Sequence, residues 1–100
     1  MTRHVAVSKL ANKKLQTLFD YLTEKWPPKV KFDFAEKLDR SIEIIKNQPE
    51  SFPQSNLKPG LHKCVVTKQT TVYFRFTSSK ITIVNIFDNR RRPSKLFKEL

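Results

Sequence analysis

Apolar side chains recur at helical spacing in two stretches near the start of the chain. The first stretch begins after Ser8, a residue type that favours helix N-caps, and ends at Pro27 and Pro28, because the residue before a proline avoids helical backbone angles. Pro28 also suits the first turn of a second helix, which we predict over residues 29–47. The two apolar stripes are Ala11, Leu15, Leu18, Leu22 and Trp26, and then Phe34, Leu38, Ile42 and Ile45.

Alternating apolar and polar positions predict strands in the rest of the chain. A short first strand is expected over residues 3–8, and after Gly60 the period changes to two, which predicts strands over residues 61–68 and 70–77. The third strand places two sets of side chains on opposite faces: Val72, Phe74 and Phe76, and then Tyr73, Arg75 and Thr77. The run that begins at Ile81 is apolar enough for a central strand buried on both faces. It ends where an arginine triplet begins.

These elements predict an α+β fold with the order β-α-α-β-β-β in one domain over residues 1–100. The Pro-Pro corner is short, so the two helices are expected to form an antiparallel hairpin on one face of a twisted sheet. Short links between the last three strands favour a mainly antiparallel sheet. The irregular stretch between Pro49 and Gly60 is either a functional loop or a plain crossover from the helices to the sheet.

The net charge of the chain narrows the classes of molecule that we expect it to bind. Twenty Lys and Arg residues against nine Asp and Glu give a net charge of +11, which favours a polyanionic partner such as a nucleic acid, a ribosome or an acidic protein. The alternative is a lysine-rich surface without a specific partner. No apolar run approaches a membrane span and no signal peptide precedes the first strand, so we expect a cytoplasmic protein that does not bind membranes.

Candidate chemistry is sparse. Cys64 lies two residues from His62 on a predicted strand, so the two share a face, but neither has the local signature of a nucleophile with its base. A small buried side chain is the expected role of Cys64. Two histidines and one cysteine favour neither a metal site nor a bound cofactor, and the single glycine excludes a glycine-rich phosphate loop.

A basic surface on the sheet is the remaining candidate site. We expect the second, third and fourth strands to bring cationic side chains over one patch, because neighbouring strands lie only about 4.8 Å apart. Arginine binds phosphate in two places, and histidine transfers protons near neutral pH. The alternative is a solvated strand edge where charge prevents aggregation. The candidate residues are His62, Lys63, Lys68, Arg75, Arg90, Arg91 and Arg92.

The element order and the end of the last strand resemble the RelE/ParE family of toxins from type II toxin–antitoxin modules. The most specific motif is the run Asp-Asn-Arg-x-x-Pro, which ends at Pro93. Supporting features are the opening Val-Ala-Val-Ser-Lys-Leu-Ala at residues 5–11, Phe34 and Leu38 in the second helix, and the prolines that follow it.

The resemblance implies a cognate antitoxin whose C-terminal segment wraps the toxin. It also implies one of two targets: ribosome-associated mRNA, which some members cut, or DNA gyrase, which ParE-like members inhibit without cutting. By position, Arg91, or Arg90 one residue away, matches the arginine that RNA-cleaving members place after the last strand. His62 falls near a lysine position of those members. Lys63, Lys68, Arg75 and Arg92 are expected to contact nucleic acid.

Two positions depart from the RNA-cleaving pattern. Thr71 stands where those members commonly carry an arginine, three residues before an aromatic. The C-terminal tail also lacks the tyrosine or histidine that several of those enzymes use, and Phe97 is its only aromatic residue. The catalytic set for an mRNA endoribonuclease is therefore incomplete. The main prediction is a toxin that acts on translation, and the alternatives are a gyrase inhibitor and a basic interaction module without toxicity.

Overall fold

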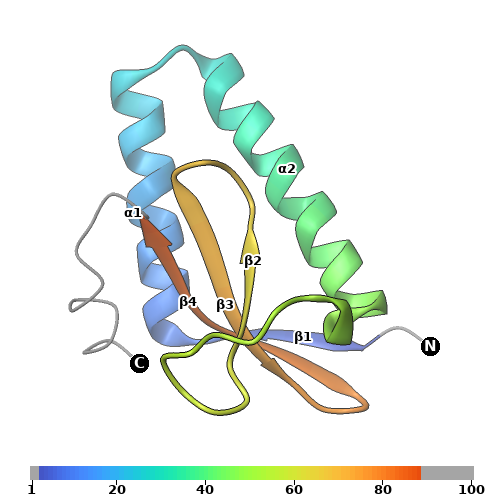
Figure 1. Cartoon of the computed structure of the whole chain (residues 1–100). Coiled ribbons are helices and arrows are strands. Elements are labelled where there is room, and N and C mark those ends of the chain that lie inside the picture. Colours follow the sequence, from blue (N-terminus) through green and yellow to red (C-terminus); the bar gives the residue numbers. More distant parts are fainter. Residues whose placement is uncertain (1–2, 89–100) are drawn as a thin grey trace.

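The computed structural model describes residues 3–88 and has the predicted α+β architecture. A first strand, β1 (His4–Val7), leads into two helices, α1 (Lys9–Lys25) and α2 (Pro28–Asn47), and a short 3₁₀ turn (Pro49–Ser51) follows. Strands β2 (His62–Val65), β3 (Thr70–Phe76) and β4 (Lys80–Asp88) complete the described chain. The helices meet at the proline corner and diverge along one side of the sheet (Figure 1). Both predicted helices and all four predicted strands are present.

The sheet has the order β1-β4-β3-β2, with β4 in its interior. Strand β1 pairs with β4 in parallel, whereas β4, β3 and β2 form an antiparallel meander. The side chains of Ile81 and Ile83 are completely or almost completely buried. The prediction of a central last strand is therefore confirmed for the part that the structure describes. Burial on both faces holds only for its last residues, where Asn85 and Phe87 are also buried, whereas Lys80 is exposed and Thr82 and Val84 are half-buried.

Strand β2 is shorter than the predicted 61–68. The side-chain hydroxyl of Thr67 accepts hydrogen bonds from the backbone N–H groups of Gln69 and Thr70, and the Val66 N–H donates to the Thr70 carbonyl. A threonine that bonds its own backbone in this way stabilises a turn in place of a ladder. Lys68 consequently lies in the β2–β3 turn and not on a strand.

The core lies between the helices and the sheet. Phe34, Leu38 and Ile45 of α2 join Ala11 and Leu22 of α1 in one buried cluster with the strand side chains Cys64, Val72, Phe74, Ile81, Ile83 and Ile86. Phe19 and Phe34 pack edge to face with ring centroids 5.7 Å apart, which joins the two helices. We call this side of the sheet the helix-facing side, and the opposite side the outer face.

A β-bulge in β4 exchanges the two faces of that strand. Phe74 pairs with Ile83 but the adjacent Tyr73 pairs with Asn85, which leaves Val84 as the extra residue. Beyond it, Ile86 belongs to the helix-facing core and Phe87 to a smaller buried cluster with Leu61 and Tyr73. The bulge therefore determines which face each later residue of β4 occupies.

Ser8 holds the bulge next to the first turn of α1. Its hydroxyl donates to the carbonyl of Val84 over 2.7 Å and accepts the Ala11 N–H over 3.0 Å, while its own N–H donates to the carbonyl of Ile83. The predicted N-cap is confirmed, and the same hydroxyl also binds the bulge.

Candidate functional site

The arginine triplet Arg90, Arg91 and Arg92 lies outside the described residues. The expected contribution of these side chains to a site therefore stays a prediction. The other four candidates, His62, Lys63, Lys68 and Arg75, are all described.

His62 lies on the helix-facing side of the sheet, where it is 9% exposed. Its ring stacks on Phe74 at 5.6 Å between centroids and lies 5.0 Å from the ring of Phe76. Its Nδ1 is buried without a hydrogen-bond partner among the residues that the structure describes. The imidazole is thus part of an aromatic cluster and is not presented to solvent.

Cys64 is a buried free thiol on the same side, two residues along β2. Burial raises the pKa of this thiol, and a hydrogen bond from Ser41 partly opposes the rise. A nucleophilic cysteine needs its thiolate, which burial disfavours. The predicted role of Cys64 as a small core side chain is confirmed.

Lys63 and Arg75 are exposed on the outer face. Lys63 pairs with Tyr73, and Arg75 lies two residues further along β3, so the two are diagonal neighbours on one face. His62 pairs with Phe74 and points the other way. The expected convergence of His62 with Lys63 and Arg75 is therefore wrong, because successive residues of a strand alternate between its faces.

Lys68 is also separated from Arg75. It lies in the β2–β3 turn before Thr70, whereas Arg75 lies near the opposite end of β3. Five residues of strand at about 3.3 Å each separate Thr70 from Arg75 by roughly 16 Å. Of the four described candidates, the fold brings together only Lys63 and Arg75.

Arg75 is tied to the loop that precedes β2. Its Nη1 donates a 2.7 Å hydrogen bond to the carbonyl of Pro59. The next residue, Gly60, has a φ of +73°, and a Cβ added there would lie 3.2 Å from the same Nη1. The only glycine of the chain thus gives the loop both its left-handed turn and its close approach to Arg75.

We expect Gly60→Ala to lower the free energy of unfolding by about 1–2 kcal/mol, because a Cβ strains a left-handed backbone. Urea denaturation measures the loss. Gly60→Asn is the matched control, since asparagine tolerates this backbone region better than alanine. Unchanged stability in Gly60→Ala would contradict the strained geometry, and equal losses in both variants would assign the cost to the contact with Arg75.

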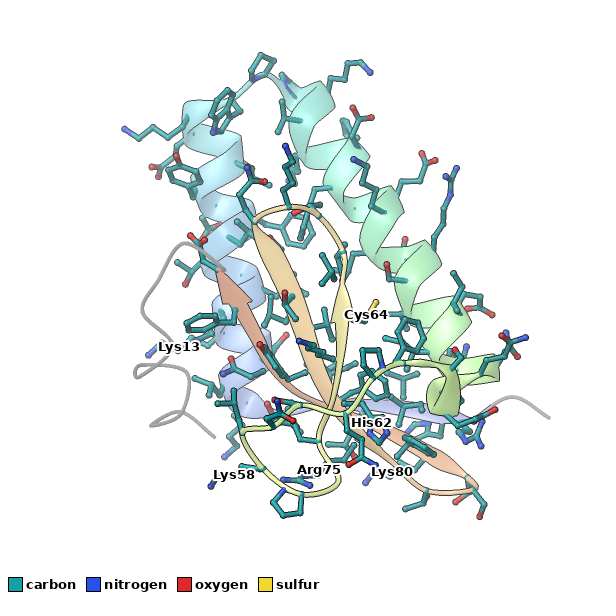
Figure 2. The ribbon with its side chains drawn as sticks, viewed as in Figure 1. Lys13, Lys58, His62, Cys64, Arg75 and Lys80 are labelled. Atoms are coloured by element: carbon teal, nitrogen blue, oxygen red, sulfur yellow. The ribbon has the colours of Figure 1, made fainter. Side chains whose placement is uncertain are left out.

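Two further cations lie at the same end of the sheet. Figure 2 shows Lys58 and Lys80 on either side of Arg75 along the lower edge of the molecule. Lys58 immediately precedes the Pro59 whose carbonyl binds Arg75. Lys80 begins β4 two residues before Thr82, the partner of Arg75, and is exposed. The sequence analysis did not single out either lysine. The absence of Asp and Glu from residues 51–87 could have indicated them, because it leaves every cation of that stretch without an acidic neighbour in sequence.

Tyr73 is the titratable side chain of β3 besides Arg75. It is 7% exposed, and burial raises the pKa of its phenol. Thr71, at the position of the arginine of RNA-cleaving toxins, is also buried. The described outer face thus carries exposed cationic side chains, but its tyrosine is poorly suited to proton transfer at neutral pH.

Apart from the sheet, the described residues form an open cleft. This cleft of about 450 Å³ lies between the helices and is lined by Leu15, Phe19, Phe32 and Ala35 with polar side chains at its rim. It contains none of the predicted site residues. Among residues 3–88, no three His, Cys, Asp or Glu side chains form a group that could hold a metal ion. No helix there is long and apolar enough to cross a membrane.

Comparisons with known proteins agree with this architecture. Residues 5–93 match the family model described as the ParE toxin of the type II toxin–antitoxin system parDE. A solved structure titled "Chromosomal ParDE TA system from P. aeruginosa" superposes with a TM-score of 0.71 at 13% sequence identity, covering 87% of this chain and 96% of that chain. That likeness shows the shared fold. No curated protein matches the chain significantly. Because the family model spans most of the sequence, this protein belongs to the ParE family and is the toxin of a type II toxin–antitoxin module.

Proposed function

We propose that this toxin inhibits DNA gyrase by binding it, without catalysing a reaction. The observation that carries the proposal is the position of His62. The imidazole expected to transfer protons is buried between Phe74 and Phe76, on the opposite side of the sheet from Lys63 and Arg75. A general acid or base must come within hydrogen-bond reach of the atoms that react. An inhibitor that acts by binding has no such requirement.

The family assignment supports the same choice. The matching model is that of the ParE toxin, and gyrase inhibition is what the resemblance to ParE-like members implies. Cleavage of ribosome-associated mRNA remains the competing proposal. It is weakened by Thr71 at the position of the expected arginine and by the raised pKa of the buried Tyr73. Under the gyrase proposal, Arg90, Arg91 and Arg92 are contacts for the target and not catalytic groups.

A supercoiling assay with purified gyrase and relaxed plasmid tests the proposal directly. We expect the toxin to inhibit supercoiling in proportion to its concentration, and the cognate antitoxin to reverse the inhibition. The parallel experiment adds the toxin to a cell-free translation reaction and follows the length of the translated mRNA. Full supercoiling at excess toxin, together with fragmented mRNA, would overturn the proposal in favour of ribonuclease activity.

The variant His62→Phe tests whether toxicity requires the imidazole, as catalysis would, or only binding. Phenylalanine keeps a ring against Phe74 and removes the buried Nδ1 that has no partner among the described residues. We expect the free energy of unfolding to change by less than about 1.5 kcal/mol. Growth arrest after induced expression should remain at the wild-type level. Loss of toxicity in a variant that is still folded would show that the imidazole itself is required, and so would contradict binding without catalysis.

A further inference from the structure

One continuous stretch of this protein, residues 51–87, carries cations and no acidic side chain. Residues 51–87 contain five Lys and Arg residues and no Asp or Glu: Lys58, Lys63, Lys68, Arg75 and Lys80. The helices, by contrast, mix the two signs and form i,i+4 ion pairs such as Lys29 with Asp33 and Arg40 with Glu36. Among the described residues, Lys63, Arg75 and Lys80 have no carboxylate within ion-pair distance.

The fold places three of the other four cations at the same end of the sheet as Arg75. Lys63 on β2 and Lys80 on β4 flank it as diagonal neighbours on the outer face. Diagonal side chains on adjacent strands lie about 7–8 Å apart, within reach of a long side chain. Lys58 joins them through the loop that Arg75 binds at Pro59. We call Lys58, Lys63, Arg75 and Lys80 the loop–sheet cluster.

The backbone around the cluster is well held. The Lys63 N–H donates to the carbonyl of Pro53, and the Ser55 N–H donates to the carbonyl of Leu61, so the loop is bonded to the start of β2. The hydrogen bond from Arg75 adds a third connection. A guanidinium has five N–H donors, and a single one is used here, so Arg75 retains donors for an anion.

The rings near the cluster favour one kind of anion. Among residues 3–88, the rings of the outer face are Tyr73 and, further along the sheet, Phe87; they are 7% and 4% exposed and belong to one buried cluster with Leu61, so neither presents a face on which a base can stack. Single-stranded nucleic acid is usually held by cations together with exposed aromatic rings. Cations without such rings suit the phosphate backbone of a duplex, whose bases are already stacked.

We propose that the loop–sheet cluster binds the phosphate backbone of duplex DNA, without reading base sequence. This inference rests on the proposed function, because gyrase acts on duplex DNA and a toxin bound to it can also contact that DNA. It differs from the expected patch in its described members, since Lys58 and Lys80 replace His62 and Lys68, while Arg90, Arg91 and Arg92 lie outside the described residues. Binding to DNA alone is measurable without gyrase, so the two proposals can fail separately.

The double variant Lys63→Gln, Lys80→Gln tests the cluster while leaving the Arg75 bond to Pro59 in place. Its matched control is Lys25→Gln, Lys37→Gln, which removes two exposed helix lysines and the same net charge. Fluorescence anisotropy of a labelled short duplex gives the binding constant of the free toxin over a range of salt concentrations. We expect the negative slope of log K against log salt to become shallower by about 1.8 in the test variant, because each phosphate contact contributes about −0.9 to it. When the salt concentration rises from 50 to 200 mM, the fold-loss of affinity is then about 12 times smaller for the test variant than for wild type.

We expect both variants to unfold at the wild-type midpoint, because all four substituted side chains are exposed. Equal salt slopes for the test and control variants would overturn the inference. A tighter complex with a poly-glutamate peptide than with a duplex of equal charge would overturn it too, because the cluster would then suit an acidic protein segment. Gyrase that is insensitive to the wild-type toxin would instead remove the proposed function, while the DNA measurement would still stand.

Discussion

Replacing Phe74 by alanine should lower the free energy of unfolding by about 3–5 kcal/mol, the largest effect expected of any single substitution considered for this chain. The side chain is fully buried. The centroid of its ring lies 5.8 Å from that of Phe52, which it meets edge to face, 5.6 Å from that of His62 and 6.3 Å from that of Phe76. Its loss removes the centre of this ring cluster and leaves a cavity, because the paired strands around it cannot move inward to fill the space. Small domains have only about 5–15 kcal/mol of stability in total.

Urea denaturation followed by far-UV circular dichroism measures the effect of Phe74→Ala. The matched control is Phe32→Ala, which deletes the same atoms from a ring that is 67% exposed on α2. We expect the control to lie within about 0.5 kcal/mol of wild type, as surface substitutions usually do. A loss below 1.5 kcal/mol in Phe74→Ala, or similar losses in the two variants, would contradict a core centred on this ring.

Removing the hydroxyl of Ser8 should cost about 2 kcal/mol, because one oxygen makes two structural bonds. Loss of an N-cap typically costs about 1 kcal/mol, and the carbonyl of Val84 loses its 2.7 Å donor as well. We therefore expect Ser8→Ala to exceed the cost of an ordinary cap deletion. Hydrogen exchange should become faster both at the Ala11 amide, which the cap binds, and in β4 beside the bulge.

Ser8→Thr is the matched variant for this test, since it keeps a hydroxyl that can serve both bonds. We expect it to restore most of the stability and the protection of β4. Thr17→Ala is a useful second control, because its hydroxyl donates only to the Lys13 carbonyl within an exposed helix turn. If Ser8→Ala speeds exchange in α1 alone and leaves β4 unchanged, the hydroxyl does not hold the bulge.

The elements that sequence predicted well depend on local signals. Ser8, Pro27 and Pro28 mark the helix ends through hydrogen bonding and backbone angles that hardly depend on the rest of the fold. The alternation of Val72, Phe74 and Phe76 with Tyr73 and Arg75 placed these side chains on the correct faces. The largest error in a strand boundary, three residues at the end of β2, came from the side-chain bonds of Thr67, which apolar periodicity does not reveal, whereas the other strand ends differ from prediction by one residue at most.

The candidate site was only partly predictable. Its basic character follows from charge alone, and the alternation of β2 already separates His62 from Lys63, so their expected convergence was avoidable. The part played by Lys58 was not predictable in the same way. It depends on the bond of Arg75 to Pro59, which joins residues 16 positions apart. Gly60 marked a turn in the sequence, but nothing there indicated which side chain the turn would meet.

By itself, the sequence determined the helices, the strands, the net charge of +11 and the resemblance to RelE/ParE toxins, because each depends on residue type and short spacing. The tertiary structure alone decided that β4 lies between β1 and β3, that an extra residue at Val84 exchanges its faces, and that His62 is buried among rings. These features arise from pairing between distant segments. Strand register is set by competing long-range contacts, and one added residue moves every later side chain to the other side of the sheet.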